Sequence, residues 1–352
     1  MKKEKTKKTL CTLFVIGLVL TACGGAAQPA APTTTMAVKM PTTPPQPTVT
    51  PTPALPTMKE YKDPSNSFSV SVPVDWTSEE GSGNVILNSP DQNALVNLLA
   101  VNTVNALDAD AFTKAINAFE FNIFSRNKNY AETKRDVQAD KGYAIITKTL
   151  DINTVPFQIS TQYEQKGKVL YVESYYSAVS AVSQYGPIFT AMDNSFKTNP
   201  AYAEDLLPFT SAPFTYTDPD NLYSLFIPSL WTFTDVNKDG SVIGYTSQDE
   251  NAVIMLVKLD LGKNVTRALA DSNALKLLKS MASDALVSKT ETLKNGSIQK
   301  TWASKAGGLG GLSIYKWSGT IWYFLTWVLS AGSGKSYSPV LDQSIASYQI
   351  PE

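Results

Sequence analysis

The chain has 352 residues, 30 of them basic and 31 acidic, which gives a net charge of −1 at neutral pH. It contains no histidine, and its two cysteines are Cys11 and Cys23. The sequence after Cys23 therefore offers no thiol nucleophile, disulfide, or His or Cys metal ligand, and a Ser-His-Asp triad is excluded. Without the first 22 residues, which hold five Lys and one Glu, 25 basic and 30 acidic residues remain, a net charge of −5. We therefore expect no nucleic-acid partner.

Residues 1–22 predict a secretory signal. Five lysines precede an apolar run over residues 10–20, which is too short to span a membrane comfortably. The run ends in Leu-Thr-Ala-Cys23, which resembles the bacterial lipobox, so the resemblance implies cleavage before Cys23 and its acylation. We expect a protein anchored through membrane lipid on the outer face of the bacterial cytoplasmic membrane. An ordinary signal peptide, or a short anchor helix with an incidental Cys23, is the alternative.

Residues 23–57 predict a lipid-anchored, disordered stalk. Residues 24–57 contain nine Pro and nine Thr, a single charged residue, Lys39, and no aromatic residue. Such a segment buries too little apolar surface to fold, and its prolines favour extended polyproline II structure. We interpret it as a spacer; a Pro-rich docking motif is the alternative.

A repeat organises the rest of the chain. Residues 61–76 recur without a gap as residues 216–231, with seven identical positions that include an Asp-Pro pair and the final Trp76 and Trp231. We therefore expect two copies of one domain, at 58–200 and 208–352, joined by a linker over 201–207.

The first copy has a readable order of elements. Phe68, Val70 and Val72 alternate with serines, which predicts a half-buried strand. Asp108 is the expected N-cap of a long amphipathic helix. In chain order we predict strands at 68–73, 85–87 and 94–101, a helix at 108–126, strands at 143–150, 155–163 and 169–177, and a short helix that opens at Pro187.

The second copy repeats this order. We predict strands at 223–227 and 252–257, a helix at 266–285 with Leu275, Leu278 and Ala282 on one face, strands at 297–304, 312–317 and 321–329, and a helix opened by Pro339, with Asp342 as the counterpart of Asp193. Strands followed by a helix and an antiparallel meander indicate an α+β fold, in which a central antiparallel sheet carries a long helix and a C-terminal helix in each copy.

These features resemble a known family. The strand ending in Val-Pro-x-x-Trp76 or Ile-Pro-x-x-Trp231, the Ser-Pro-Asp turn at residues 89–91, the long helix, the meander and the final helix resemble the PsbP/Mog-like fold of PsbP and of LpqN-type bacterial lipoproteins. The resemblance implies an antiparallel sheet with helices packed against it and an accessory, scaffold or binding role. It carries no catalytic signature.

One candidate site is a calcium-like turn. Asp235, Asn237 and Asp239 precede Gly240 as in the first half of an EF-hand loop. At the twelfth position of the loop, where an EF-hand has a bidentate Glu, this chain has Thr246. Strands are also expected on both sides of the segment, so a hairpin turn is the competing interpretation. We assign no metal site.

The other candidate site is aromatic. The last predicted strand is apolar on both faces, and it has Leu325 where the first copy has Glu173. Either its aromatic residues pack in the core or against the sister domain, or they form a sugar- or lipid-binding face. The tentative ligand-binding residues are Trp317, Trp322, Phe324 and Trp327.

No cofactor and no catalytic residue is predicted. The leading expectation is a non-catalytic binding or scaffold lipoprotein with an unidentified extracytoplasmic protein, glycan or lipid partner. One alternative is an ABC-type substrate-binding lipoprotein, although those proteins have alternating βαβ lobes rather than antiparallel repeats. A cell-wall or polysaccharide hydrolase that uses acidic residues alone is the other.

Overall fold

The structure is a computed structural model, and it describes residues 55–81, 83–219 and 223–349. The predicted signal peptide, Cys23 and nearly all of the predicted stalk lie outside the described residues.

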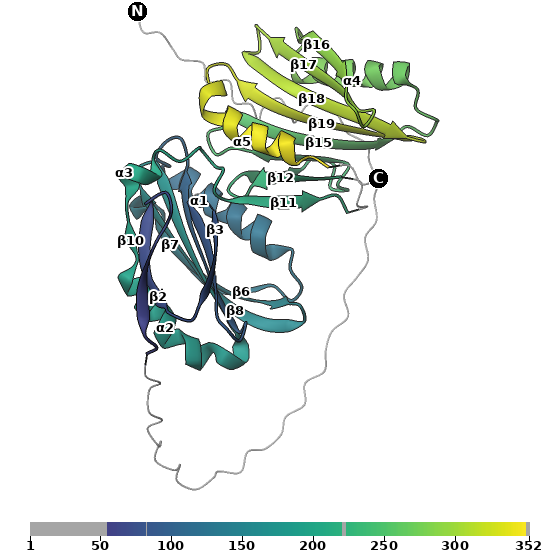
Figure 1. The fold of residues 1–352 in the computed structure, drawn as a ribbon. Coiled ribbons are helices and arrows are strands. Elements are labelled where there is room, and N and C mark those ends of the chain that lie inside the picture. Colours follow the sequence, from purple (N-terminus) through teal and green to yellow (C-terminus); the bar gives the residue numbers. More distant parts are fainter. Residues whose placement is uncertain (1–54, 82, 220–222, 350–352) are drawn as a thin grey trace, which may run out of the picture. The chain divides into compact units, whose positions relative to one another are not determined.

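Two seven-stranded antiparallel sheets form the framework of the described residues (Figure 1). The strand order is β3-β4-β5-β9-β8-β7-β6 in the first sheet and β13-β14-β15-β19-β18-β17-β16 in the second. Each position in the second order carries a number ten higher than in the first, so the two sheets share one topology. The chain is therefore a tandem α+β protein, as the sequence predicts.

The first copy consists of these elements. The strands of its sheet are β3 (Thr77–Gly81), β4 (Asn84–Asn88), β5 (Ala94–Asn102), β6 (Ala131–Gln138), β7 (Tyr143–Ile152), β8 (Val155–Lys166) and β9 (Val169–Ala178). The small sheet β1-β2-β10 contains Met58–Lys62, Phe68–Pro73 and Lys197–Thr198. The helices are α1 (Ala109–Phe119), which continues as a π-helix, η2 (Glu120–Ser125), then α2 (Val182–Ser195), α3 (Pro200–Ala203) and the 3-10 turns η3 (Ala139–Lys141) and η4 (Val179–Ala181).

The second copy is built alike. The strands of its sheet are β13 (Thr232–Asp235), β14 (Val242–Thr246), β15 (Ala252–Asp260), β16 (Leu286–Thr292), β17 (Ile298–Ser304), β18 (Leu309–Ser318) and β19 (Ile321–Ser330). The hairpin of β11 (Pro213–Thr217) and β12 (Ser224–Pro228) corresponds to β1 and β2, and the helices are α4 (Arg267–Met281) and α5 (Gly334–Ser347).

The repeated motif forms equivalent hairpins in the two copies. Trp76, which follows β2, packs edge-on against Tyr185 of α2, with ring centroids 6.0 Å apart. Trp231 contacts Tyr337 of α5 in the same way at 6.1 Å. The shared tryptophan therefore joins the first hairpin of each copy to its C-terminal helix.

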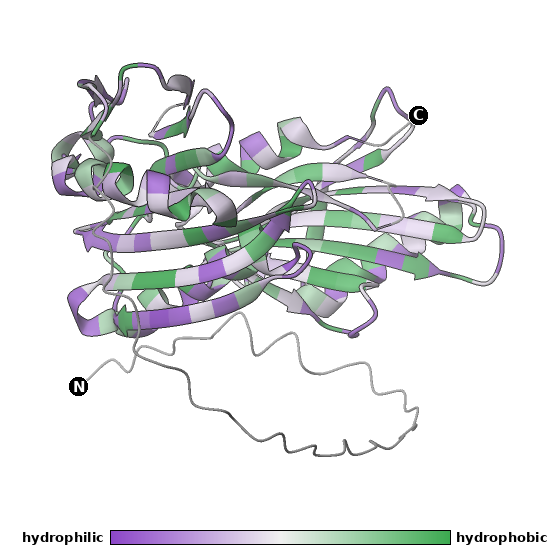
Figure 2. Ribbon diagram, turned by 90° about the horizontal axis from the view of Figure 1, so that it is seen from below, coloured by the Kyte–Doolittle hydropathy of each residue, from purple (hydrophilic) through white to green (hydrophobic). Residues whose placement is uncertain are grey.

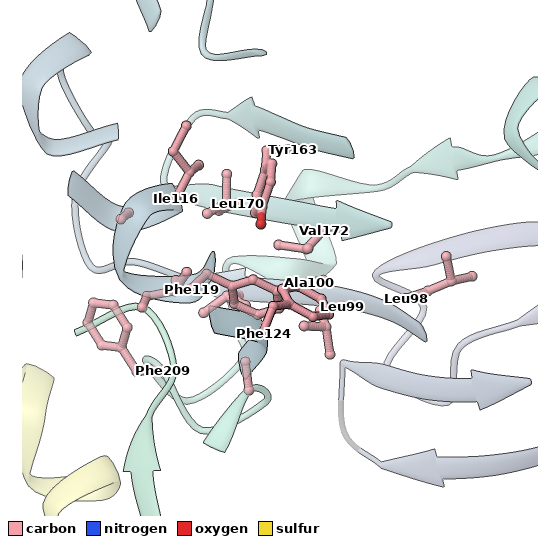
Figure 3. Packing of buried hydrophobic residues seen from close by; sticks show 14 of the residues in the cluster. Leu98, Leu99, Ala100, Ile116, Phe119, Phe124, Tyr163, Leu170, Val172 and Phe209 are labelled. Atoms are coloured by element: carbon pink, nitrogen blue, oxygen red, sulfur yellow. The ribbon is translucent and has the colours of Figure 1, made fainter. Parts of the chain in front are cut away.

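Hydrophobic and hydrophilic residues alternate along many of the strands (Figure 2). Because successive side chains of a strand point to opposite faces, each sheet has two different faces. On β8, Ile159, Thr161 and Tyr163 are fully buried on the face that α1 covers, where Phe119 meets Tyr163 at 5.8 Å. Figure 3 shows this packing of α1 and η2 against β8, β9 and β5. The residues between them on β8 face α2 instead.

The helix starts agree only in part with the predictions. The Asp108 carboxylate accepts a hydrogen bond from the Ala111 amide, which confirms the N-cap. However, α2 begins at Val182 and α5 at Gly334, so Pro187 and Pro339 lie inside their helices instead of opening them. A proline this close to a helix start removes only one helical hydrogen bond, which the packing of α2 and α5 offsets.

Two other expectations are corrected, and the expected linker makes contacts of its own. β2 pairs with β1 and with the distant β10, and therefore lies outside the seven-stranded sheet. Leu275 is 40% exposed, because the buried face of α4 carries Ala270, Ala274 and Leu278. Within the expected linker at 201–207, the carbonyl oxygens of Glu204 and Leu206 accept hydrogen bonds from the Asn102 amide of β5, both at 2.9 Å.

Candidate functional site

A pocket of about 260 Å³ lies in the first copy between α2 and strands β7, β8 and β9. Strand β8 contributes three polar side chains, and α2 contributes a carboxylate and an aromatic ring. The polar and aromatic side chains that line the pocket include those of Gln158, Ser160, Gln162, Tyr175, Phe189 and Asp193.

The strand register explains why these side chains meet. Ser160 lies opposite Tyr175, and Gln162 lies opposite Glu173, in the antiparallel pairing of β8 with β9. Because directly opposite residues project to the same face of a sheet, all four side chains point toward α2. The Tyr143 hydroxyl of β7 donates a hydrogen bond to Gln162 Oε1 at 3.2 Å. The floor of the pocket is therefore polar and partly fixed by hydrogen bonds.

Glu173 does not line the pocket itself, but it lies opposite Gln162 of the lining, and its environment favours the protonated form. It is 2% exposed, and the Tyr175 hydroxyl donates to its Oε2 at 2.7 Å. Burial raises the pKa of Glu173 to about 8; the hydrogen bond from Tyr175 opposes this rise, and the negative charges of Asp193 and Glu164 add to it. Burial also raises the pKa of Asp193.

The second copy supplies an internal comparison. The Thr161 and Ser174 hydroxyls lie 3.2 Å apart in the first sheet, and the Ser313 and Thr326 hydroxyls lie 2.8 Å apart at the same place in the second. The residue numbers differ by 152 in both strands, and they differ by the same amount between Tyr185 and Tyr337, which make matching hydrogen bonds to Asp91 and Asp249. The two copies therefore align without gaps from β8 to the C-terminal helix.

In this alignment Leu or Ile replaces four polar residues of the pocket lining, Ser160, Gln162, Ser177 and Asp193, whereas glycine replaces Gln158 and an aspartate replaces Thr190. Leu325 replaces Glu173, and Ile345 replaces Asp193, so Asp342 is the counterpart of Thr190 and not of Asp193 as the sequence suggested. Ile314 and Leu325 are each 3% exposed. The counterparts of Gln158, Ser160, Gln162, Glu173, Ser177 and Asp193 are Gly310, Leu312, Ile314, Leu325, Leu329 and Ile345.

A second polar cluster lies on the opposite face of the first sheet, under α1 and η2. Lys148 is fully buried, forms an ion pair with Glu120, donates to Thr161 at 2.9 Å, and lies 3.7 Å from the ring centroid of Phe124. The Tyr163 hydroxyl donates to the same Glu120 oxygen at 2.6 Å. Burial lowers the pKa of Lys148 to about 8, although the charge of Glu120 opposes this shift. None of these residues lines the pocket, and we interpret the cluster as core packing.

The structure places most of the predicted aromatic site in the core. Trp322, Phe324 and Trp327 are 1%, 2% and 1% exposed, whereas Trp317 is half-buried. Trp322 and Phe324 pack with Tyr315 on the side of α4, but Trp327 faces α5 and donates to Ser344 at 3.0 Å. The four residues thus lie on two strands and on both faces of the sheet, and three of them are closed to a ligand.

The predicted calcium-like residues lie in the turn between β13 and β14. Asp235 accepts from the Gly240 amide at 3.1 Å, Asn237 donates to Ser241 at 2.8 Å, and Asp239 accepts from the Ser241 amide at 2.8 Å. These bonds close a hairpin turn. Within the described residues, no group of three or more His, Cys, Asp or Glu side chains gathers as a metal site would require.

Sequence reasoning missed the pocket, although a signal for it was present. Glu173 was noted as the counterpart of Leu325, but the accompanying change of Ser160 and Gln162 to Leu312 and Ile314 was not. Together these differences mark one face of β8 and β9 as polar in the first copy and apolar in the second.

The fold defines the class of the protein as a tandem α+β protein with two copies of a seven-stranded antiparallel sheet. No protein-family model matches the sequence, and the comparison with curated proteins finds no match. Among the described residues, no helix is long and apolar enough to cross a membrane.

Solved structures show distant similarity in fold. Cyanobacterial PsbP (CyanoP) from Synechocystis sp. PCC 6803 matches with a TM-score of 0.31 and 12% identity, over 40% of this chain and 93% of its own. LpqN, involved in cell envelope biogenesis of Mycobacterium tuberculosis, matches with a TM-score of 0.27 and 11% identity, over 40% and 92%. A structure from Bacteroides thetaiotaomicron matches with a TM-score of 0.28 and 14% identity over 48% of this chain, which spans about half (52%) of that structure.

Proposed function

We propose that the protein is a lipid-anchored, extracytoplasmic binding protein of the tandem PsbP-like type. Its first copy holds a small polar ligand in the pocket between α2 and β7 to β9, and its second copy is a structural partner. The observation that carries this proposal is the contrast between the copies. Four polar residues that line the pocket in the first copy, Ser160, Gln162, Ser177 and Asp193, are replaced by Leu or Ile in the second copy of the same topology.

The proposed role is binding rather than catalysis. Glu173, the carboxyl group with the most favourable pKa for a general acid, is 2% exposed and already holds the Tyr175 hydroxyl. A general acid must come within hydrogen-bond reach of the atom that it protonates. The competing function is a hydrolase that uses acidic residues, and a zymogram on cell-wall and polysaccharide substrates separates the two. Clearing by the wild type that is lost in Asp193→Asn would establish the hydrolase.

The pocket is tested by giving it the residues of the second copy. We expect a thermal-shift screen of small polar compounds to yield hits with the wild type that disappear in the double variant Ser160→Leu, Gln162→Ile. Ser288→Leu, on the exposed edge strand β16, is the matched control and should keep every hit. Hits that survive in the double variant, or a screen without hits, would contradict the proposal.

The proposed anchor rests on the N-terminal sequence and is tested separately. Cys23→Ala in the full chain should prevent acylation and either release the protein from the membrane fraction or leave its signal uncleaved. Unchanged processing and unchanged membrane retention would show that Cys23 is not the anchor.

A further inference from the structure

We infer that the ligand of the first-copy pocket is a small organic cation with an ammonium group, held against the rings of Tyr175 and Phe189 and beside the Asp193 carboxylate. This inference rests on the proposed function and adds the chemical class of the ligand. Its two parts are the charge of the pocket and the arrangement of the aromatic rings.

The charge of the pocket favours a cation. No Lys or Arg occurs among the described residues that line it, and Asp193 is the one charged residue in the lining. Asp193 is half-buried, and it has no ion-pair partner in the described part of the chain. A partly desolvated carboxylate without a cationic partner attracts a cation and repels an anion.

The aromatic rings supply the second part of an ammonium site. Tyr175 of β9 and Phe189 of α2 both line the pocket, with ring centroids 5.3 Å apart and planes inclined by 47°. Aromatic faces beside a carboxylate are a recurring arrangement for the recognition of ammonium groups. In the second copy the corresponding residues are Trp327, Leu341 and Ile345, so these three positions lack the carboxylate and one of the two rings, and the nearest carboxylate along the chain is that of the exposed Asp342 at the position of Thr190.

The size and polarity of the remaining lining limit the ligand further. A volume of about 260 Å³ suits a molecule below drug size. Gln158, Ser160 and Gln162 lie along β8, on the opposite side of the pocket from α2, and offer hydrogen bonds to a hydroxyl or amide substituent of the cation. The ligand class is therefore a compact ammonium compound with one polar substituent.

Binding should also depend on pH because Glu173 lies opposite Gln162 of the pocket lining, on the same face of the sheet. The groups that face Glu173 are Tyr175 on its own strand, Glu164 on β8, Tyr143 on β7 and Asp193 on α2, and none of them is basic. A bound cation stabilises the ionised form of Glu173 and promotes loss of its proton. Affinity should therefore rise by about three- to tenfold between about pH 6 and about pH 8.5.

The test is isothermal titration of the full-length protein with choline, with its uncharged isostere 3,3-dimethyl-1-butanol, and with acetate. We expect choline to bind at least about tenfold more tightly than the isostere and acetate not to bind. Asp193→Asn, which keeps the side-chain shape, should weaken choline binding by about tenfold or more. Asp140→Asn, in the exposed turn η3, is the matched control and should bind as the wild type does.

The outcomes separate this inference from the proposed function. Equal binding of choline and its isostere, no choline binding up to roughly 20 mM, or full binding by Asp193→Asn would overturn the cationic ligand. In those cases the pocket itself still stands if screening hits are lost in the Ser160→Leu, Gln162→Ile variant. If no hit responds to that variant, the proposed function fails as well.

Discussion

Replacing Glu173 by glutamine is expected to stabilise the protein at alkaline pH and to leave its stability at acidic pH almost unchanged. Burial raises the pKa of Glu173 from 4.5 to about 8 in the folded protein. Between these values the folded chain holds a proton that the unfolded chain has released, so wild-type stability falls as the pH rises through this window. Glutamine has no such proton, and its carbonyl oxygen can accept the Tyr175 hydrogen bond.

The size of the effect follows from the pKa change. Each tenfold change in the ionisation constant corresponds to about 1.4 kcal/mol. The free energy of unfolding of the variant therefore exceeds that of the wild type by at most about 5 kcal/mol. Relaxation of the protein and water penetration generally reduce the cost of ionising a buried group. We therefore expect a difference of about 2 kcal/mol at about pH 8.5, or roughly 5 °C in Tm. The other titrating groups contribute equally to the stability of variant and wild type, so their contributions cancel in this difference.

Urea unfolding at about pH 5 and about pH 8.5 measures this difference. Glu79→Gln on β3 is the matched control, because Glu79 is exposed and its replacement should change stability equally little at both pH values. The reasoning is refuted if the free energy of unfolding of Glu173→Gln differs from that of the wild type by the same amount at the two pH values.

Three further predictions concern the fold. Asp108→Ala removes the N-cap of α1 and should lower the free energy of unfolding by about 1 kcal/mol in urea, whereas Asp108→Asn should retain most of it. Lys148→Met leaves Glu120 buried without its cation and should lower the free energy of unfolding by about 3–5 kcal/mol. Adding Glu120→Gln should restore part of this loss, and a double variant that is no more stable than Lys148→Met would refute the pairing. Trp317 is half-buried, so Trp317→Phe should remove most of the fluorescence that acrylamide quenches, and unchanged quenching would place the exposed indole elsewhere.

Local sequence patterns predicted the elements better than their partners. Alternation of Phe68, Val70 and Val72 identified β2, and the Asp108 cap identified the start of α1. The pairing of β2 with β10, however, joins Ser69 to Lys197, a long-range contact that no local pattern reports. For this reason the strand was predicted correctly and its sheet was not.

The candidate site was less predictable because it depends on how α2 packs. A proline is a common signal for a helix start, and this rule placed the start of α2 at Pro187, five residues after its true start at Val182. The first turn of α2 lies beside β8 and supplies Val182 to the pocket lining. When this turn is left out of the predicted helix, Ser160 and Gln162 are interpreted as the solvent-exposed face of a strand instead of the floor of a pocket.

The two copies together explain why the pocket is the place to look for function. In the second copy, Leu325 and Ile345 bury apolar surface at positions where the first copy has Glu173 and Asp193, and apolar burial stabilises a fold. Burying a carboxyl group with no cation beside it costs stability, as the raised pKa of Glu173 shows. The topology shared by the two copies thus accommodates the more stabilising apolar side chains of the second copy. The first copy nevertheless carries the less stabilising carboxyl groups at these positions. Locally unfavourable residues that gather around a pocket are expected where a ligand is bound, and a cation at Asp193 would supply the charge that this site lacks.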